Sequence, residues 1–347
     1  MIREAIAHIV AGATLSEDEA AAVMEEIMSG VATQAQMGAF LTALRLRPGG
    51  ETVAEIAGLA RIMREKAVQV HLVERVSTHA LDTCGTGGDG AGTFNVSTAA
   101  GILAAAAGAS VAKHGNRSAT SLCGSADVLE ALGARIDLGP EQVARCVQEV
   151  GFGFMFAPAY HPAMKHVGPT RREIGIRTVF NILGPLTNPA HARYQVLGVA
   201  DGSLLRKMGE VLLHLGCQHA LIIHGEDGID ECSLSAPTHI CEVRSGQELR
   251  EYVITPEEVG LTSITDHQPF HGGDPAYNAS ILRSLLSEYK ADPATDMVCL
   301  NTGAALLANE QVASLREGIN LARATLQDGK AKQKLQDVIA CSRALSS

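Results

Sequence analysis

A glycine-rich stretch bordered by polar residues is the part of this sequence best equipped for chemistry. Residues 82–98 read DTCGTGGDGAGTFNVST, with five glycines between positions 85 and 92. Glycine tolerates positive φ and lets the backbone approach a ligand closely, and the free N–H groups at a helix start attract anions. Asn95, Ser97 and Thr98 would add side-chain donors there. The stretch predicts an oxyanion cradle for phosphate, and its plain alternative is a flexible connector with an ordinary helix cap.

The same glycines also fit the pattern G-x-G-x-x-G, from Gly85 to Gly90. This pattern is a weak indication of dinucleotide binding when it stands alone. A dinucleotide fold needs an acidic residue after its second strand to hold a ribose hydroxyl. Lys113 and His114 occupy that place here, and a lysine suits an anion, so we disfavour a nicotinamide cofactor.

A second polar loop, residues 113–125, reads KHGNRSATSLCGS. Lys113 can act as a point charge on phosphate. The hydroxyl groups of the loop can donate to phosphate oxygens; they belong to Ser118, Thr120, Ser121 and Ser125. A solvated turn is the plain alternative, in which Ser125 only caps the following helix and Arg117 is only a surface charge.

Two adjacent carboxylates form a third candidate site within the sequence DGIDE, residues 227–231. An acidic pair in a loop is usually just solvated. Near a pyrophosphate cradle, however, Asp230 and Glu231 could bind Mg²⁺, with phosphate oxygens and water as the other ligands. Asp227 is a weaker candidate for the same role.

The elements that position these residues change in character along the chain. The first ~67 residues show three capping boxes and no alternating strand pattern, which predicts a small helical domain. From residue 79 onward, short apolar runs alternate with helical stretches. The predicted strands are 79–83, 110–113, 152–157, 194–199 and 220–224, with single helices between most of them. This pattern is typical of a parallel sheet with helices on both faces.

Two further segments complete this prediction. Residues 165–189 read as a helix followed by a turn at Gly184–Pro185, and the residues from Pro293 read as two or three helices.

Composition excludes several classes of protein. The net charge of −10 and the aromatic content of 3% argue against nucleic-acid binding. The eight cysteines contain no C-x-x-C pair, which argues against a zinc site. No apolar run is long enough to span a membrane. We therefore expect a cytoplasmic protein that binds neither nucleic acid nor membrane.

Together, the two polar loops resemble those of the family of anthranilate phosphoribosyltransferases and nucleoside phosphorylases. Residues 156–189, FAPAYHPAMKHVGPTRREIGIRTVFNILGPLTNP, look like the anthranilate branch, as do DGIDE and the all-helical start. The resemblance implies an α/β fold: a small N-terminal helical domain and a larger domain with a mainly parallel central sheet flanked by helices. The helical domain would comprise residues 1–70, completed by about 165–188. The larger domain would comprise 71–164 and 189–347.

The implied reaction belongs to tryptophan biosynthesis. It transfers the 5-phosphoribosyl group of phosphoribosyl pyrophosphate (PRPP) to the amine of anthranilate and releases pyrophosphate. Because the amine is itself the nucleophile, no acid–base residue is expected; Lys113, Asp230 and Glu231 would act electrostatically. Mg²⁺ is the implied cofactor, as two ions brought in part by pyrophosphate, and the implied assembly is a homodimer through the helical domain.

The resemblance also assigns residues to each ligand. Those implied for PRPP are Gly85, Gly88, Asp89, Thr93, Asn95, Val96, Ser97, Thr98, Lys113, His114, Gly115, Asn116, Arg117, Ser118, Ala119, Thr120, Ser121 and Ser125. Those implied for anthranilate are Gly85, His114, Asn116, Tyr160 and Arg171, and His161 and Met164 would help to shape its pocket. Those implied for the metal are Ser97, Asp230 and Glu231.

Two rival functions make different demands on the sequence. A nucleoside phosphorylase would use free phosphate and would need no metal pair, so Asp230, Glu231 and residues 156–189 argue against it. A non-enzymatic relative that binds nucleic acid should be basic, whereas this chain is acidic.

Overall fold

The computed structural model describes residues 1–118 and 121–345. It begins with a bundle of four helices: α1 (Ile2–Val10), α2 (Glu17–Met28), α3 (Gln34–Leu46) and α4 (Val53–Glu65). The three predicted capping boxes are confirmed, with Ser16, Thr33 and Thr52 as the N-cap residues of α2, α3 and α4. The sequence therefore determines where these helices begin, because each cap satisfies N–H groups that have no partner within the helix.

Close packing and one buried ion pair hold the bundle together. A Cβ atom at Gly58 of α4 would lie 2.2 Å from the carbonyl oxygen of Glu17, so only glycine allows α2 and α4 to pack this closely. Arg47 donates to Glu55 over 2.7 Å, and both side chains are almost fully buried. Glu55 also accepts from the backbone N–H of Leu15 and Thr52, which satisfies the carboxylate inside the bundle.

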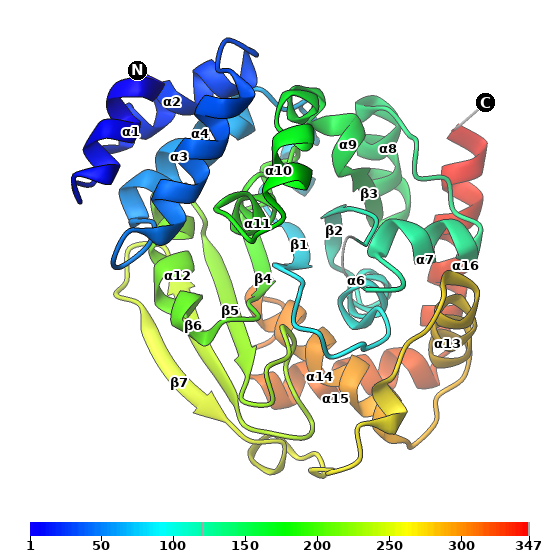
Figure 1. Cartoon of the computed structure of the whole chain (residues 1–347). Helices are drawn as coiled ribbons and strands as arrows, with labels where there is room; N and C mark the ends of the chain where they lie inside the picture. The colour runs from blue at the N-terminus through cyan, green and yellow to red at the C-terminus, as the bar shows by residue number, and fades with distance from the viewer. Residues whose placement is uncertain (119–120, 346–347) are drawn as a thin grey trace.

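A seven-stranded sheet forms the centre of the larger lobe, in the order β3-β2-β1-β4-β5-β6-β7 (Figure 1). The five strands from β3 to β5 are parallel, and β6 and β7 are antiparallel additions at one edge. The strands are β1 (Ala80–Gly85), β2 (Ser110–Gly115), β3 (Phe152–Phe156), β4 (Tyr194–Gly198), β5 (His219–Gly225), β6 (Thr238–Arg244) and β7 (Arg250–Ile254).

The strand order places a binding crevice at one position. The chain proceeds outward from β1 through β2 to β3, then crosses to β4 on the other side of β1. Such a reversal leaves a crevice beyond the carboxyl ends of the central strands, because the connections on its two sides run in opposite directions. The glycine loop follows β1 at this point.

Alternate side chains of the strands face two separate cores, as a sheet covered on both faces requires. Leu221 and Ile223 pack with α6 (Val96–Ala106) and α14 (Pro293–Ala308). Ala220 and Ile222 share the other core with α12 (Leu205–His214) and the helical bundle. The remaining α-helices of this lobe are α5 (Glu74–Ser77), α7 (Ser125–Leu132), α8 (Pro140–Val150), α13 (Pro275–Ser287), α15 (Leu315–Gln327) and α16 (Lys330–Leu345).

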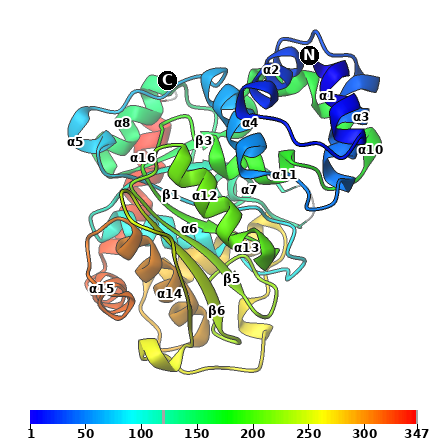
Figure 2. The same ribbon diagram turned by 90° about the vertical axis from the view of Figure 1, so that its left-hand side faces the viewer.

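Residues 157–186 form a chain of short helices. They are α9 (Ala157–Tyr160), η1 (Pro162–His166), α10 (Gly168–Ile174), α11 (Phe180–Leu183) and η2 (Gly184–Leu186). Of these, η1, α10 and α11 lie against the bundle and α9 packs on β3 (Figure 2). Val167, Phe180 and Leu183 are buried in the same core as the helices α1–α4. This packing supports the assignment of residues 165–188 to the helical lobe; the division of the chain into two domains stays a prediction.

The predicted fold class is confirmed, and the differences concern the sheet edge. Strands β6 and β7 and helix α13 were not among the predicted elements. Three 3₁₀ turns complete the chain: η3 (Gly202–Leu204), η4 (Glu257–Val259) and η5 (Gln268–Phe270). Among the described residues, no helix combines the length and the apolar character needed to cross a membrane.

Candidate active site

A cleft of about 1310 Å³ opens at the carboxyl ends of β1 and β2, between the sheet and the helices of residues 157–186. Three segments that are far apart in the sequence line it. They are the glycine loop and the start of α6, the loop after β2, and the segment around Arg171. Asp230 and Glu231, which follow β5, complete the wall. The topology thus gathers the separate motifs of the sequence into one site.

The glycine loop is shaped around Asp230. The backbone N–H of Gly87 donates to Asp230 Oδ2 over 2.8 Å. A Cβ atom at Gly85 would lie 2.4 Å from the same oxygen, and one at Gly198 would lie 1.7 Å from the Asp230 carbonyl oxygen. Glycine is therefore required at the end of β1, which the Asp230 carboxylate approaches, and at the end of β4, which the Asp230 backbone carbonyl approaches.

The first turn of α6 faces the cleft with its donors. The backbone N–H of Ser97 donates to Glu231 Oε1 over 3.1 Å. In the part of the chain that the structure describes, the buried hydroxyl group of Thr98 has no hydrogen-bond partner. Asn95, the N-cap residue, has its amide tied to Cys123 and Asn278. The helix start thus already holds one carboxylate, as the positive end of a helix favours, and keeps one buried hydroxyl group unpaired.

The carboxylates of the cleft are electrostatically unfavourable without a cation. Burial, together with the charge of Asp89, raises the pKa of Asp230 to about 6. Burial, followed by the charge of Asp230, raises the pKa of Glu231 well above its usual value. Both shifts mean that the ionised forms lack compensating charge, and a divalent cation would supply it.

The donor set fits Mg²⁺ shared with a phosphate ligand. Within residues 1–118 and 121–345, no three His, Cys, Asp or Glu side chains are grouped as a complete metal site. Mg²⁺ is usually held by one or two carboxylates together with substrate phosphates and water. Asp230 and Glu231 beside the glycine loop match that requirement, and the Ser97 hydroxyl lies at the same edge.

Lys113 is buried beneath this wall. Its Nζ atom donates to the carbonyl oxygen of Thr83 and lies 3.4 Å from the hydroxyl oxygen of Ser97. Burial lowers the pKa of Lys113, and the neighbouring Asp82 opposes that effect. The Lys113 ammonium group is therefore close to the buried carboxylate of Asp82 and to the two cleft carboxylates, Asp230 and Glu231.

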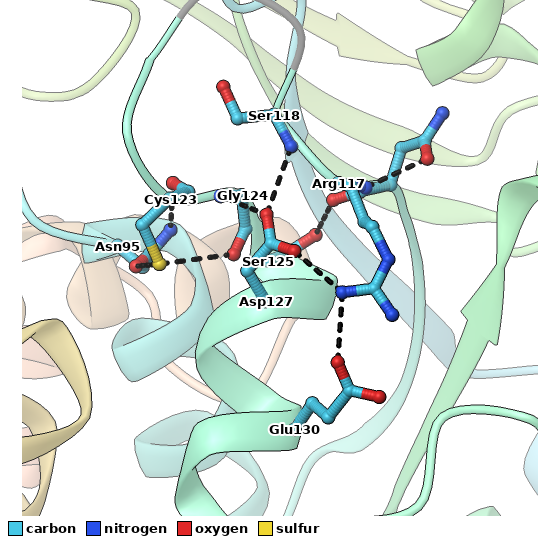
Figure 3. A network of polar contacts seen from close by, with 9 residues as sticks. Asn95, Arg117, Ser118, Cys123, Gly124, Ser125, Asp127 and Glu130 are labelled. Carbon is cyan, nitrogen blue, oxygen red and sulfur yellow. Dashed lines mark hydrogen bonds and ion pairs between the residues drawn. The ribbon is translucent and has the colours of Figure 1, made fainter. Parts of the chain in front are cut away.

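The loop after β2 is held by Asp127 of α7 (Figure 3). Asp127 accepts from the backbone N–H groups of Gly124 and Ser118 over 2.9 and 3.2 Å. Arg117 donates to Asp127 and Glu130 over 2.7 and 2.8 Å. The Arg117 charge is thus directed toward α7. The predicted residues Ala119 and Thr120 lie outside the described residues.

Two neutral histidines form part of the other half of the cleft. The rings of His114 and His161 lie with their centroids 5.0 Å apart, and neither Nε2 atom has a partner within the described chain. Burial lowers the pKa of His114 to about 3 and that of His161 to about 4. Both rings are therefore uncharged at neutral pH, so an aromatic ligand meets a pocket wall without positive charge there.

Arg171 supplies a cation to this half of the cleft. Its guanidinium group lies 5.6 Å from the centroid of the Phe180 ring, and burial lowers its pKa. The arginine remains charged, since its usual pKa lies far above neutrality. A charged, planar donor beside an aromatic wall suits an aromatic carboxylate.

Comparison with known proteins identifies the family. Residues 3–67 match the model of the glycosyl transferase family, helical bundle domain, and residues 77–332 match that of the glycosyl transferase family, a/b domain. The anthranilate phosphoribosyltransferase of Chloroflexus aggregans is 55% identical over 99% of this chain and 98% of its own. The chain belongs to the anthranilate phosphoribosyltransferases. It has the corresponding transferase activity in tryptophan biosynthesis, as the sequence predicted.

Solved structures of other anthranilate phosphoribosyltransferases share this architecture. The crystal structure from Thermus thermophilus is 45% identical, with a TM-score of 0.91 over 98% of this chain and 99% of that one. The Saccharomyces cerevisiae enzyme in complex with PRPP and Mg is 28% identical, with a TM-score of 0.89 over 99% and 98%. The same enzyme in complex with 4-fluoroanthranilate has a TM-score of 0.85 at 28% identity over 95% and 94%.

Most of the residues predicted for this phosphoribosyltransferase line the one cleft. They are Gly85, Gly88, Asp89, Thr93, Asn95, Val96, Ser97, Thr98, Lys113, His114, Gly115, Asn116, Arg117, Ser118, Ser121, Ser125, Arg171, Asp230 and Glu231. Two described candidates do not line it. Tyr160 is 1% exposed, and its hydroxyl donates to the Leu138 carbonyl oxygen over 2.9 Å, behind the pocket wall. Its neighbour His161 faces the cleft instead. Asp227, the weaker metal candidate, instead accepts from the Ser233 hydroxyl over 2.7 Å.

Several lining residues were not predicted. Gly272 and Gly273 and the first turn of α13 border the start of α6, where Asn278 donates to Asn95 over 3.0 Å. The sequence GGDP at 272–275 was an available sign, since aspartate followed by proline often starts a helix. Arg177 also lines the cleft, and its spacing from the other motifs gave no indication of that.

Proposed function

We propose that this cleft joins anthranilate to the ribose of PRPP by stabilising charge on the departing pyrophosphate, with no residue acting as acid or base. The observation that carries the proposal is the position of two carboxylates with raised pKa against an array of backbone N–H groups. One side of that site attracts a cation and the other an anion. A magnesium-bound diphosphate has both requirements.

The PRPP side is formed by the glycine loop, the start of α6 and the loop after β2. Loss of pyrophosphate from C1 places negative charge on its oxygens, and fixed N–H donors stabilise such charge because they need little reorganisation. Gly85, Gly88, Asp89 and Thr93 would shape the loop, while residues 95–98 present the helix start. Lys113 would act from beneath, and residues 114–118 with Ser121 and Ser125 would cover the phosphoribosyl group.

Asp230, Glu231 and Ser97 would hold the metal, in an arrangement of two ions shared with pyrophosphate. When bound, Mg²⁺ neutralises charge on the diphosphate oxygens. The raised pKa of both carboxylates supports this assignment, because compensation by a cation would restore their ionised form. Lys113 lies close enough to both carboxylates to share in that compensation.

The anthranilate side lies between Arg171, Asn116 and the histidine pair. Arg171 would pair with the carboxylate of the substrate, and Asn116 and Gly85 would border the reacting amine. The neutral rings of His114 and His161 exclude water and form an apolar wall. Holding the amine near C1 contributes through orientation, since the reacting groups need not find each other by diffusion.

The remaining proposals concern assembly and location. A homodimer through the helical lobe would cover apolar side chains there, since Val10, Val31 and Leu46 are each at least 70% exposed. All eight cysteines are free thiols, which suits the reducing cytoplasm. We propose neither a nucleic-acid nor a membrane partner.

The test is the loss of anthranilate fluorescence on addition of PRPP, with and without Mg²⁺. Combined Asp230→Asn and Glu231→Gln substitution should abolish magnesium-dependent turnover, because the cation would lose both carboxylate ligands. The matched control is Glu257→Gln with Glu258→Gln, an adjacent exposed pair in η4, which should leave turnover unchanged. Unchanged kinetics in the first double variant would remove the metal site from the proposal.

A further inference from the structure

Arg177 connects the helical lobe to the glycine loop. It follows α10, in the segment that packs on the bundle. Its Nη1 atom donates to the carbonyl oxygen of Gly88 and its Nη2 atom to that of Gly87, each over 3.1 Å. One guanidinium group therefore holds two consecutive peptide groups of a loop that consists largely of glycine.

These two bonds determine where the neighbouring N–H groups point. In a planar trans peptide, the N–H of one residue is directed opposite to the carbonyl of the residue before it. The carbonyl groups of Gly87 and Gly88 face Arg177, so the N–H groups of Gly88 and Asp89 are directed away from it. Those N–H groups belong to the stretch proposed to bind diphosphate.

Within the described chain, the carbonyl groups of Gly87 and Gly88 accept from no donor other than Arg177. Gly87 and Gly88 both have positive φ, of 62° and 74°, a region in which glycine moves freely. The N–H of Gly87 is fixed on the other side by Asp230, over 2.8 Å. A Cβ atom at Gly88 would lie 1.8 Å from Arg177 Nη1, so the glycine also makes room for the guanidinium group.

We propose that Arg177 is a positioning residue: it orients the N–H groups of Gly88 and Asp89 toward the diphosphate of PRPP. This inference rests on the function proposed above. The segment 165–188 would then contribute to both sides of the site. It carries Arg171 on the anthranilate side, and through Arg177 it orients the glycine loop on the other side of the cleft. Binding then needs less ordering of the glycine loop.

Steady-state kinetics of Arg177→Ala provide the first test. The KM for PRPP should rise about tenfold, the order expected when charge-assisted hydrogen bonds are lost. The KM for anthranilate should stay within about twofold. Arg177→Lys should restore part of the effect, since an ammonium group can hold one carbonyl oxygen at a time. The control is Arg193→Ala, which removes the same charge. Arg193 is exposed and lies just before the amino end of β4.

The second test is made on the ligand-free enzyme and separates positioning from direct contact. NMR relaxation should give lower backbone order parameters for Gly88 and Asp89 in Arg177→Ala and unchanged values in Arg193→Ala. A raised KM with unaltered order parameters would mean that Arg177 contacts the diphosphate itself, and would overturn positioning. An unaltered KM for PRPP would overturn it too. Absence of PRPP-dependent turnover in the unsubstituted enzyme would instead contradict the proposed function.

Discussion

At the scale of single residues, burial shifts the pKa values of carboxylates and histidines in the two halves of the cleft in opposite directions. Burial raises the pKa of Asp230 to about 6, whereas it lowers that of His114 to about 3. One half of the cleft therefore attracts cations, and the other presents neutral rings beside the cation of Arg171. This division matches a substrate pair consisting of a metal-bound diphosphate and an aromatic carboxylate.

Arg171→Ala should raise the KM for anthranilate by about 10- to 100-fold, because a carboxylate would lose a charged, two-pronged donor. The KM for PRPP should change much less. Fluorescence kinetics with each substrate varied in turn would measure both values. Arg171→Lys is the matched variant, because it keeps the charge without the planar geometry. Its KM for anthranilate should lie between those of the unsubstituted enzyme and of Arg171→Ala. Equal effects of Arg171→Ala on the two KM values would contradict the assignment.

Most residues found from the sequence pattern occupy motifs that follow strand ends, whereas Arg171, which the family resemblance supplied, lies on α10. Gly85, Gly115 and Asp230 each stand at or just after the carboxyl end of a strand. Arg177 was missed because it reaches the site from the helical lobe. Asn278 was missed because the sequence GGDP marks the start of α13 but does not indicate that this helix borders the cleft. Whether a residue lies near the cleft depends on how the lobes pack, which the local sequence does not show.

At the scale of elements, the antiparallel edge depends on a buried charge cluster between β5 and β6. Glu242 accepts from His219 over 3.0 Å and from Arg244 over 2.8 Å. The hydrogen bond from His219, and then the hydrogen bond and charge of Arg244, lower the pKa of Glu242 to about 2. Tyr252 of β7 and Glu310 are the other titratable groups that face the cluster.

Glu242→Gln should lower the free energy of unfolding by about 2–3 kcal/mol at pH 7. The folded carboxyl has a depressed pKa, so its contribution is complete above the usual value of 4.5 and is lost as the pH falls toward about 2. Urea unfolding between pH 7 and pH 3 would measure the free energies of unfolding of Glu242→Gln and of the unsubstituted protein. The difference between them should become smaller below about pH 5. The control is Glu251→Gln, whose ion pair with Arg206 is exposed and contributes little. A difference independent of pH would contradict this account.

Element prediction from sequence succeeded where the signals are local. Each capping box marked a helix start, and strands with continuous apolar runs were identified within one to two residues of their ends. Strands β6 and β7 were missed because charged residues interrupt their apolar pattern, as in Glu242, Arg250 and Glu251. β7 is an edge strand with much of its surface exposed, so it carries little of the hydrophobic periodicity that indicates a strand.

At the scale of the whole molecule, a half-buried arginine joins the four-helix bundle to η2 and to the end of α12 in the sheet lobe. Arg64 of α4 donates to the carbonyl oxygens of Leu186 and Leu215, over 2.5 and 3.1 Å, and burial lowers its pKa to about 10. Backbone acceptors, rather than an acidic side chain, receive its hydrogen bonds. The cleft lies between the two lobes, so this anchor helps to set its width.

The proposed homodimer should have a mass of about twice 36.3 kDa in light scattering after gel filtration. Val10→Glu with Leu46→Glu should yield monomers, because both side chains are exposed apolar groups of the helical lobe that a dimer would bury. Val253→Glu is the control: it places a charge on an exposed apolar position of β7, and the dimer should persist. A monomeric unsubstituted protein would contradict the dimer.

The sequence by itself determined the helix starts, the parallel sheet, the family and the motifs that carry the chemistry. Each of these depends on neighbouring residues, or on a pattern with a short period, which a linear sequence records. Only the tertiary structure decided that Asp230 holds the glycine loop, that Tyr160 lies behind the pocket and that Arg177 reaches across the cleft. Such contacts join residues separated by many positions in the chain, and the packing of the two lobes brings them together.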